Sequence, residues 1–482
     1  MTLEQNKNQA MKYLDDNSEI FAELSHFIWD NPELSLKEFK AADAYAKALA
    51  ALGFEVSRDV CGIETAVSGS FGSGAPVIAF LGEFDALSEL SQTPCGTKRE
   101  PQISGGNGHG CGHNMLGAGS LAAAAAAADY LKKSGASGTV IFYGCPGEEG
   151  GAAKAFMARE GIFYNLDAAL SWHPGDVNEV RTGTNNSSLQ VLYTFKGISS
   201  HAADSPEHGR SGLDAAELMN IGVQYLREHM KSECRVHYAM ISSGGCSPNV
   251  VQPEASVLYM VRAVAVRDSL DLLERVDKIA QGAALMTETV LHRQFIDGTA
   301  NLVPNFTIEK LLQENLLFAA IPDYTPQELD FAKTLTASYD SPVAPGAASK
   351  FDSAIAEWVR EKTDGMSRVI NDFIMPEYHG EGFTAGSTDV GDVSWQCPTS
   401  QINAVCFPSG CPGHSWQMVS CGRSSIGDKG LLFAGKVLAC TAIDLFENSD
   451  KLSAAKAEFE RRTRDGYLCP VPEGVAPIAL EC

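Results

Sequence analysis

A glycine-rich segment at residues 106–114, GNGHGCGHN, places His109, Cys111 and His113 among residues with little or no side chain. Glycine lets a backbone turn sharply, and histidine together with cysteine suits a divalent ion such as zinc. The segment therefore predicts a metal-binding loop. The alternative is a glycine-rich turn whose polar side chains face water, and so short a cluster does not separate the two.

Further candidate ligands and a candidate base lie in three other short segments. Glu148 and Glu149 are adjacent in PGEEGG, His173 lies in LSWHPG, and His414 lies in PSGCPGHSWQ. If the backbone turns at the glycines around the acidic pair, one carboxylate can bind a metal ion while the other acts as a general base. The alternatives are a solvated acidic turn and ordinary surface histidines. Because the candidate histidines all lie beside glycine or proline, we favour a shared metal site.

The elements that must position these residues follow an α/β pattern. Apolar segments at residues 76–87, 138–151 and 166–174 alternate with segments of helical spacing, among them 39–53 and the alanine-rich 119–133. This alternation predicts a mostly parallel sheet, and ligand sites in such sheets lie at the carboxyl ends of the strands. One sheet edge is therefore expected to gather the candidate residues. The alanine run suits a helix that packs closely on the sheet, and we assign it no chemistry.

The pattern changes near residue 188 and predicts an inserted domain. Segments from 188 to 300 follow the order βαββαβ, which indicates a small α+β domain with an antiparallel sheet, expected to serve as a lid or in dimerisation. We therefore expect a catalytic domain in two parts, 1–187 and 301–482, with the insertion at 188–300 between them. After residue 300 the pattern looks irregular until the apolar segments at 398–410 and 430–446.

Composition limits the possible partners. The 482 residues include 60 acidic and 37 basic side chains, a formal charge of -23, which disfavours binding to nucleic acids and to anionic membrane surfaces. No apolar run approaches the roughly 20 residues that span a bilayer, and the first residues lack the pattern of a signal peptide. The 13 cysteines are an odd number scattered through a large chain, as expected of reduced thiols. These features predict a cytoplasmic enzyme.

Eight short motifs together resemble the aminoacylase/carboxypeptidase family of metal-dependent amidohydrolases. In chain order they are GEFDAL, GHGCGHN, CPGEEGG, WHP, KGISSHAA, SPNVV, GSTDVGDVSW and GHSWQ. The resemblance implies that Glu148 is the general base and that Asp85 orients a ligand from behind the metal. It also implies one or two divalent ions, manganese or zinc, held by Cys111, His113, Glu149, His173 and His414.

The resemblance also assigns residues of the inserted domain. His201 is implied to donate a hydrogen bond to the oxyanion and to reach the active site of a second chain, with a buried structural histidine as the alternative. Asn249 and Arg210 match motif positions where a substrate carboxylate could bind, although Arg210 could equally be a surface ion-pair partner. Asp389 matches a further site motif.

Two positions near the metal loop depart from the pattern of relatives. Asn114 stands where related chains often have aspartate, so it supplies no charge. Glu83 replaces the residue that other branches use near the metal. Both departures bear on the number and identity of the ions.

The implied reaction is metal-dependent hydrolysis of the amide bond of an N-acyl or aroyl amino acid. We expect p-aminobenzoyl-glutamate as the first candidate substrate and a small dipeptide as the second. The expected assembly is a homodimer, or a heterodimer with a related subunit. Two alternatives remain, a metal-free relative kept as a binding protein and a noncatalytic protein that buffers metal.

Overall fold

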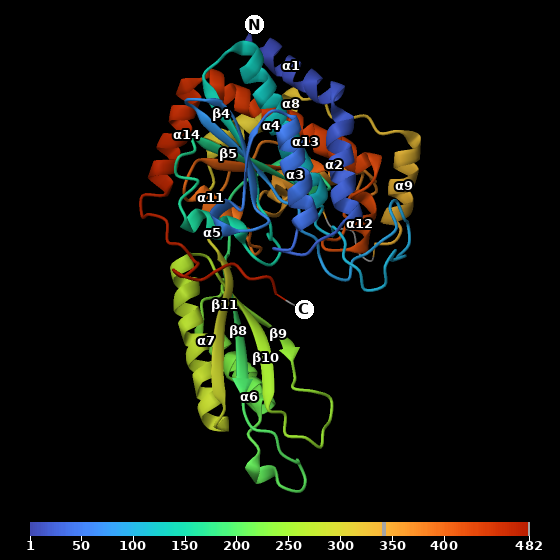
Figure 1. Cartoon of the computed structure of the whole chain (residues 1–482). Coiled ribbons are helices and arrows are strands. Elements are labelled where there is room, and N and C mark those ends of the chain that lie inside the picture. Colours follow the sequence, from blue (N-terminus) through green and yellow to red (C-terminus); the bar gives the residue numbers. More distant parts are fainter. Residues whose placement is uncertain (340–343, 481–482) are drawn as a thin grey trace. The chain divides into compact units, whose positions relative to one another are not determined.

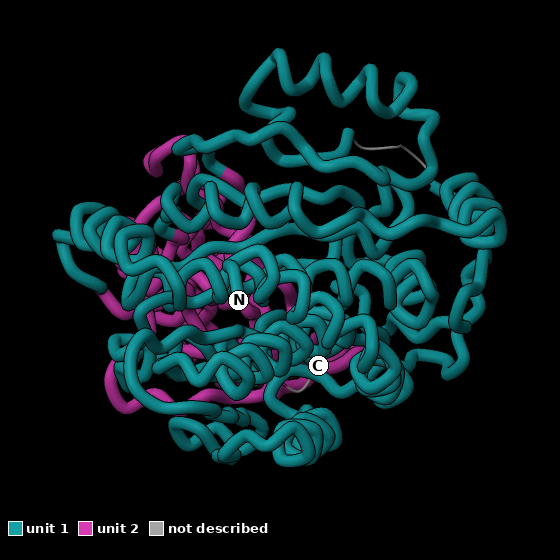
Figure 2. Tube along the Cα trace, turned by 90° about the horizontal axis from the view of Figure 1, so that it is seen from above, with its two compact units in different colours: residues 1–184, 303–383, 393–467 teal, residues 185–302, 384–392, 468–482 magenta. Residues whose placement is uncertain are grey.

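The computed structural model describes residues 1–339 and 344–480, and these divide into two compact units. The first unit comprises residues 1–184, 303–383 and 393–467, and the second comprises 185–302, 384–392 and 468–482. Figure 2 draws the two units in teal and magenta. The chain crosses between the two units at five places, two of which fall within the short strands β7 (Thr184–Asn185) and β12 (Phe383–Thr384).

A seven-stranded sheet with the order β1-β2-β4-β3-β5-β13-β6 forms the centre of the first unit. Its four middle strands, β4, β3, β5 and β13, are mutually parallel, while β1, β2 and β6 add antiparallel pairs at the edges. The predicted α/β class with a mostly parallel sheet is therefore confirmed. The strands are β1 (Glu55–Arg58), β2 (Val67–Ser73), β3 (Val77–Gly82), β4 (Gly138–Gly144), β5 (Ala168–Gly175), β6 (Glu179–Arg181) and β13 (Thr399–Val405).

Two long helices, α4 (His113–Ser134) and α13 (Ser425–Glu447), pack against each other and against this sheet (Figure 1). Every alanine of the run 122–128 is buried. A side chain at Gly435 would lie only 3.2 Å from the Ala122 Cβ atom, so the two helix backbones approach closely. Small side chains make this spacing possible, which agrees with the packing role expected for the alanine run.

The remaining helices of the first unit surround this core. Three precede the first strands, namely α1 (Leu3–Asp16), α2 (Ser18–Asp30) and α3 (Phe39–Ala51). Buried Lys7 ties α1 to α13 by an ion pair of 2.7 Å between its Nζ and Asp444 Oδ2. The others are α5 (Ala153–Arg159), α12 (Trp416–Cys421) and α14 (Ser449–Arg462). The boundary between the two units at residues 392 and 393 falls within a further short helix, α11 (Val390–Ser394). Among the residues placed by the structure, no helix is long and apolar enough to cross a membrane.

The stretch after residue 300 includes three α-helices up to residue 362, so the expectation of an irregular pattern is wrong for that part, whereas residues 363–389 form no helix. It contains α8 (Phe306–Phe318), α9 (Pro326–Thr336) and α10 (Ser353–Lys362). The sequence did carry start signals: Asn305 caps α8, and Thr325 with Glu328 forms a capping box at α9. Helix α8 also buries Ile308, Leu311, Leu312 and Leu316 at helical spacing.

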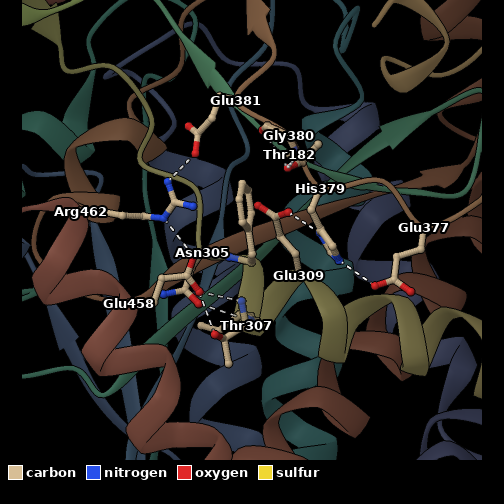
Figure 3. A network of polar contacts seen from close by, with 12 residues as sticks. Thr182, Asn305, Thr307, Glu309, Glu377, His379, Gly380, Glu381, Glu458 and Arg462 are labelled. Atoms are coloured by element: carbon tan, nitrogen blue, oxygen red, sulfur yellow. Dashed lines mark hydrogen bonds and ion pairs between the residues drawn. The ribbon is translucent and has the colours of Figure 1, made fainter. Parts of the chain in front are cut away.

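A buried carboxylate anchors α8 to the segment 377–381 (Figure 3). Glu309 Oε2 lies 2.9 Å from His379 Nδ1, and His379 Nε2 lies 2.8 Å from Glu377 Oε1. The hydrogen bond to Glu309 raises the pKa of His379 above its usual value near 6.5, against the opposing effect of burial, and Glu377 adds to the rise. Burial also raises the pKa of Glu309. Protonated His379 is therefore the form that stabilises this network.

We expect this network to lose stability as the pH rises. The pKa of His379 is raised in the folded state. Its contribution to the free energy of unfolding is therefore complete below the unfolded pKa of about 6.5, and it is lost as the pH rises through the folded pKa. The effect should be about 1 kcal/mol or less, since the ring is partly exposed. Thermal midpoints of the wild-type and His379→Gln proteins between pH 6 and 9 would test this. The thermal midpoint of the wild type should exceed that of His379→Gln near pH 6, and the two midpoints should converge toward pH 9. A difference between the midpoints that does not change with pH would contradict the prediction.

The second unit contains a four-stranded antiparallel sheet with the order β11-β8-β10-β9. Its elements follow the chain order β8 (Ser187–Lys196), α6 (Gly212–Leu226), β9 (Arg235–Ser242), β10 (Glu254–Ala263), α7 (Val266–Thr287) and β11 (Val290–Thr299). The expected βαββαβ order is confirmed. The unit also takes in residues 384–392 and 468–482, which no sequence pattern indicated. For example, Arg262 Nη1 donates a hydrogen bond of 3.0 Å to Ser387 Oγ.

Candidate metal centre

Four neighbouring parallel strands position the candidate site of the first unit. In order across the sheet, β4, β3, β5 and β13 end at the same edge, as parallel strands must. Helix α4 begins beside this edge, because its first residue, His113, lies 2.8 Å from Asp85, which follows β3. The residues placed there are Glu83 and Asp85 after β3, Cys111 and His113 at the start of α4, Glu148 and Glu149 after β4, His173 in β5, and His414 between β13 and α12.

The metal loop turns into α4 at Gly112, whose φ of 78° a side chain would disfavour. The buried His113 ring that follows is oriented by Asp85, with 2.8 Å between Nδ1 and Asp85 Oδ1. Its Nε2 is buried without a hydrogen-bond partner, 3.4 Å from Glu83 Oε2. A buried ring nitrogen of this kind costs free energy unless something binds it, and a metal ion would do so.

Potential ligand atoms gather in three groups within the described part of the chain. In each group the atoms lie within 4.8 Å of one another. Cys111 Sγ lies 3.3 Å from His173 Nε2, and His414 Nε2 lies 3.3 Å from Glu149 Oε1. The groups are Cys111 with His113 and His173, Cys111 with Glu149 and His414, and Glu83 with His113 and Glu148. All five implied ligands therefore converge.

The electrostatics of this cluster favour cation binding. Burial raises the pKa of the Cys111 thiol, but the His173 and His113 rings outweigh it and hold that pKa well below its usual value. Burial and the nearby Cys111 raise the pKa of Glu149 to about 7. Burial also opposes ionisation of Asp85, yet His113 and further hydrogen bonds lower its pKa to about 2. A thiolate, imidazoles and carboxylates around buried, partly unsatisfied atoms fit a divalent metal ion.

The two positions that depart from related chains differ in what they contact. Asn114 Nδ2 donates hydrogen bonds to Ser25 Oγ and Gly422 O, at 3.0 and 2.8 Å, so its side chain ties α4 to neighbouring segments. Glu83 Oε1 instead pairs at 2.7 Å with Lys154 Nζ, and both side chains are buried. The sequence does not predict this ion pair, because no local pattern around Lys154 identifies Glu83, which is far away along the chain, as its partner.

His109 belongs to none of the ligand groups found among the described residues, although it lies in the same glycine-rich loop. Its ring is buried, with Nε2 3.1 Å from Ile28 O. Burial, together with the nearby His113, lowers the pKa of His109 to about 4. The structure therefore gives His109 a packing role rather than a place among the ligands.

The candidate residues of the inserted domain all lie in the second unit. His201 is exposed, unlike the buried structural histidine considered as the alternative, and its segment pairs with that of Asn249 through a 2.9 Å bond from Ala202 N to Asn249 O. Arg210 Nε donates to Glu288 Oε2 at 2.8 Å, the type of ion pair considered from the sequence. Asp389 is fully buried, and its charge adds to the burial that raises the pKa of Asp297 to about 7.

Cys111 offers a direct test of the ligand set. As a metal-bound thiolate it should resist alkylation in the metal-loaded protein and react once a chelator removes the ion, because coordination occupies the sulfur. Peptide mapping by mass spectrometry after brief iodoacetamide treatment measures this site alone. Exposed Cys246 serves as the control, since its labelling should not depend on the metal. Equal labelling of Cys111 in both states would remove it from the ligand set.

The fold and this cluster define a metallopeptidase-type hydrolase, and comparison with known proteins agrees. Residues 79–417 match the model of peptidase family M20/M25/M40. The chain belongs to this family, which confirms the resemblance found in the motifs, and it is a metal-dependent amidohydrolase.

Individual relatives extend the comparison to nearly the whole chain. One of the subunits of the p-aminobenzoyl-glutamate hydrolase of Escherichia coli (strain K12) is 42% identical, covering 98% of this chain and 100% of its own. The Xaa-Arg dipeptidase of Mus musculus is 26% identical, covering 97% of this chain and 95% of its own. A dinuclear metal-binding M20 peptidase from Bacillus subtilis shares the fold, with a TM-score of 0.53 and 16% identity over 90% of this chain and 99% of its own.

Proposed function

We propose that this chain hydrolyses the amide bond of an N-acyl or aroyl amino acid, with p-aminobenzoyl-glutamate as the first candidate substrate. The observation that carries the proposal is the convergence of Cys111, His113, Glu149, His173 and His414 beside Glu148. The substrate is supported by the 42% identity to a p-aminobenzoyl-glutamate hydrolase chain of Escherichia coli over nearly the full length of both proteins.

Because Cys111 belongs to two ligand groups, we propose two ion positions that share its thiolate. His113 and His173 would complete one position, and Glu149 and His414 the other. His113 can serve one ion only, since its Nδ1 is committed to Asp85. The ions would be manganese or zinc, and when bound they would supply Lewis acidity and a water whose pKa is lowered to about 7.

Other side chains would transfer the proton, orient a metal ligand and bind the substrate. Glu148, next to Glu83 and His113, would accept the proton of the attacking water and pass it to the leaving amine nitrogen. Asp85 would hold His113 through Nδ1, a support that typically raises metal affinity by about 10 to 100-fold. In substrate binding, Asn249 and Arg210 are the candidates for contact with the amino-acid carboxylate.

His201 would donate a hydrogen bond to the developing oxyanion from a second chain. Its Nδ1 accepts hydrogen bonds from the backbone N–H groups of Ala203 and Asp204, at 3.2 and 3.1 Å. The neutral ring therefore carries its proton on Nε2, the tautomer that a donor to an oxyanion requires.

The second unit offers an edge for association. Strand β9 lies at the end of its sheet, and Tyr238, Met240 and Ile241 on it are exposed. An unpaired edge with exposed apolar side chains favours pairing with another chain. We propose that a second chain covers this edge, either a copy or a related subunit. Support for a related subunit comes from Escherichia coli, where the 42% identical relative and another relative, 28% identical, are named as two different subunits of p-aminobenzoyl-glutamate hydrolase.

We also propose a cytoplasmic location. The cysteines among the described residues form no disulfide, as expected in a reducing compartment. Oxidation state measured on protein isolated with a rapid thiol trap would test this, and a disulfide-bonded chain would contradict it.

A panel of substrates tests the proposed reaction. Chelated protein reloaded with manganese, zinc or cobalt would be assayed on p-aminobenzoyl-glutamate, on N-acyl amino acids and on dipeptides, including Xaa-Arg dipeptides because of the mouse relative. Metal-dependent release of glutamate is expected. Tight metal uptake without turnover of any of these amides would instead support the metal-buffering alternative. Faster cleavage of Xaa-Arg dipeptides would identify a dipeptidase.

A further inference from the structure

Two buried carboxylates hold the backbone on either side of Glu148. Asp85 Oδ2 accepts a 2.9 Å hydrogen bond from the N–H of Glu149, and Glu38 Oε1 accepts a 2.8 Å bond from the N–H of Gly147. Both carboxylates are at most 1% exposed. The backbone is therefore held at the residue before and at the residue after the candidate base, by side chains that come from different parts of the chain.

Glu38 is itself held in place by its neighbours. Its Oε1 also accepts from the N–H of Leu36 at 2.9 Å, and its Oε2 accepts from Thr65 Oγ1 at 2.9 Å. Burial, with the negative charge of Asp85 nearby, raises the pKa of Glu38 to about 8. A carboxyl group with this many fixed partners provides a rigid acceptor for the N–H of Gly147.

The segment that carries Glu38 also packs against the Glu148 turn. A side chain at Gly147 or Gly151 would lie within 3.1 Å of Leu36, so the turn rests on Leu36. Gly147 has a φ of 65°, which glycine adopts without strain. In the same segment, Ser35 Oγ donates to Asp85 Oδ2 at 2.9 Å. Residues 35–38 therefore supply one of the two carboxylates that hold the turn, bind the other through Ser35, and pack against the turn through Leu36.

We propose that Glu38 is a positioning residue for the reaction: through the N–H of Gly147 it fixes the turn that aims Glu148 at the attacking water. The inference rests on the proposed role of Glu148 as general base. It explains why a fully buried carboxylate lies behind the turn without joining any ligand group among the described residues. Misplacement of a catalytic group by about 1 Å can cost about 10²-fold in rate, so loss of this contact should act on kcat.

The variants Glu38→Leu and Glu38→Gln separate positioning from general stability. Leucine removes the acceptor for Gly147, whereas glutamine keeps an accepting oxygen. In the metal-loaded protein, kcat should fall about 10²-fold in Glu38→Leu and about tenfold or less in Glu38→Gln. KM and the metal content per chain should stay near wild-type values, because Glu38 touches neither substrate nor ion. If Glu38→Leu does not fold, Glu38→Gln alone tests the inference, and its kcat should then lie below the wild-type value at unchanged metal content.

A matched control comes from another buried carboxylate of the same unit. Glu309 is 1% exposed and bonds to His379 in the network of Figure 3, so Glu309→Gln should lower the thermal midpoint but leave kcat unchanged. Wild-type kcat in both Glu38 variants, or a loss of kcat that follows a loss of metal, would overturn the inference.

Glu148→Gln separates this inference from the proposed function. If Glu148→Gln is inactive while both Glu38 variants keep full kcat, only the positioning role fails. If Glu148→Gln keeps its turnover, the assignment of the base fails, and the positioning role fails with it.

Discussion

Replacing Glu148 with glutamine is expected to lower kcat by about 10² to 10⁴-fold while the metal content stays near the wild-type value. The amide keeps the size of the carboxylate but cannot accept the proton of the attacking water. Glu149 differs, because it is grouped with Cys111 and His414, and its Oε1 lies 3.3 Å from His414 Nε2. The Glu149→Ala variant should therefore lose metal, and its activity should fall with the metal content.

Metal analysis by mass spectrometry on gel-filtered protein, combined with the rates, distinguishes these two roles. Both variants should fold, since the turn that carries the acidic pair is held by Asp85 through a backbone N–H. Equal loss of metal in the two variants would show that both carboxylates are ligands, and the assignment of Glu148 as the base would then be wrong.

Mixing two inactive variants is expected to restore activity if His201 acts on the site of a second chain. His201→Ala and Glu148→Ala should each be nearly inactive alone, with about 10² to 10³-fold lost from the missing oxyanion donor in the first. In a mixed dimer the chain with intact Glu148 receives its histidine from the other chain, so one complete site is rebuilt. A statistical mixture should then recover roughly a quarter of the wild-type activity.

The experiment requires dissociation, mixing, reassociation and confirmation of mixed dimers by native mass spectrometry. His208→Ala is the matched control, because His208 lies on the same loop with an exposed side chain and should leave the rate unchanged. Activity no higher than that of the parents in confirmed mixed dimers would show that His201 does not act across chains. Purified complexes should first be checked for a second polypeptide, since a related subunit could supply the histidine.

Several features of this protein follow from local sequence patterns. Apolar segments that alternate with helical ones predicted the parallel sheet, and the βαββαβ order predicted the antiparallel one; both are present. The capping signals at Asn305 and Thr325 show that local sequence also specifies the starts of α8 and α9. Local patterns carry this information because periodicity and capping depend on residues a few positions apart.

The approximate location of the candidate site was also determined by the sequence. Polar residues that follow apolar strands lie at one sheet edge whenever the strands are parallel, so Glu149, His173 and His414 could be assigned to one place before any distance was known. The motifs then supplied their expected roles. In the structure these side chains do converge around Cys111.

Only the tertiary structure decided which groups contact each other behind that site. Glu38 reaches Gly147 across 109 positions, and Lys154 pairs with Glu83 across a shorter but still long stretch of the chain. Asn114 binds Gly422 rather than facing the ligands, and His109 turns to Ile28 although it lies in the metal loop. A hydrogen bond or a buried ion pair depends on ångström-scale distances between segments that the chain brings together by packing, and no local pattern encodes those distances.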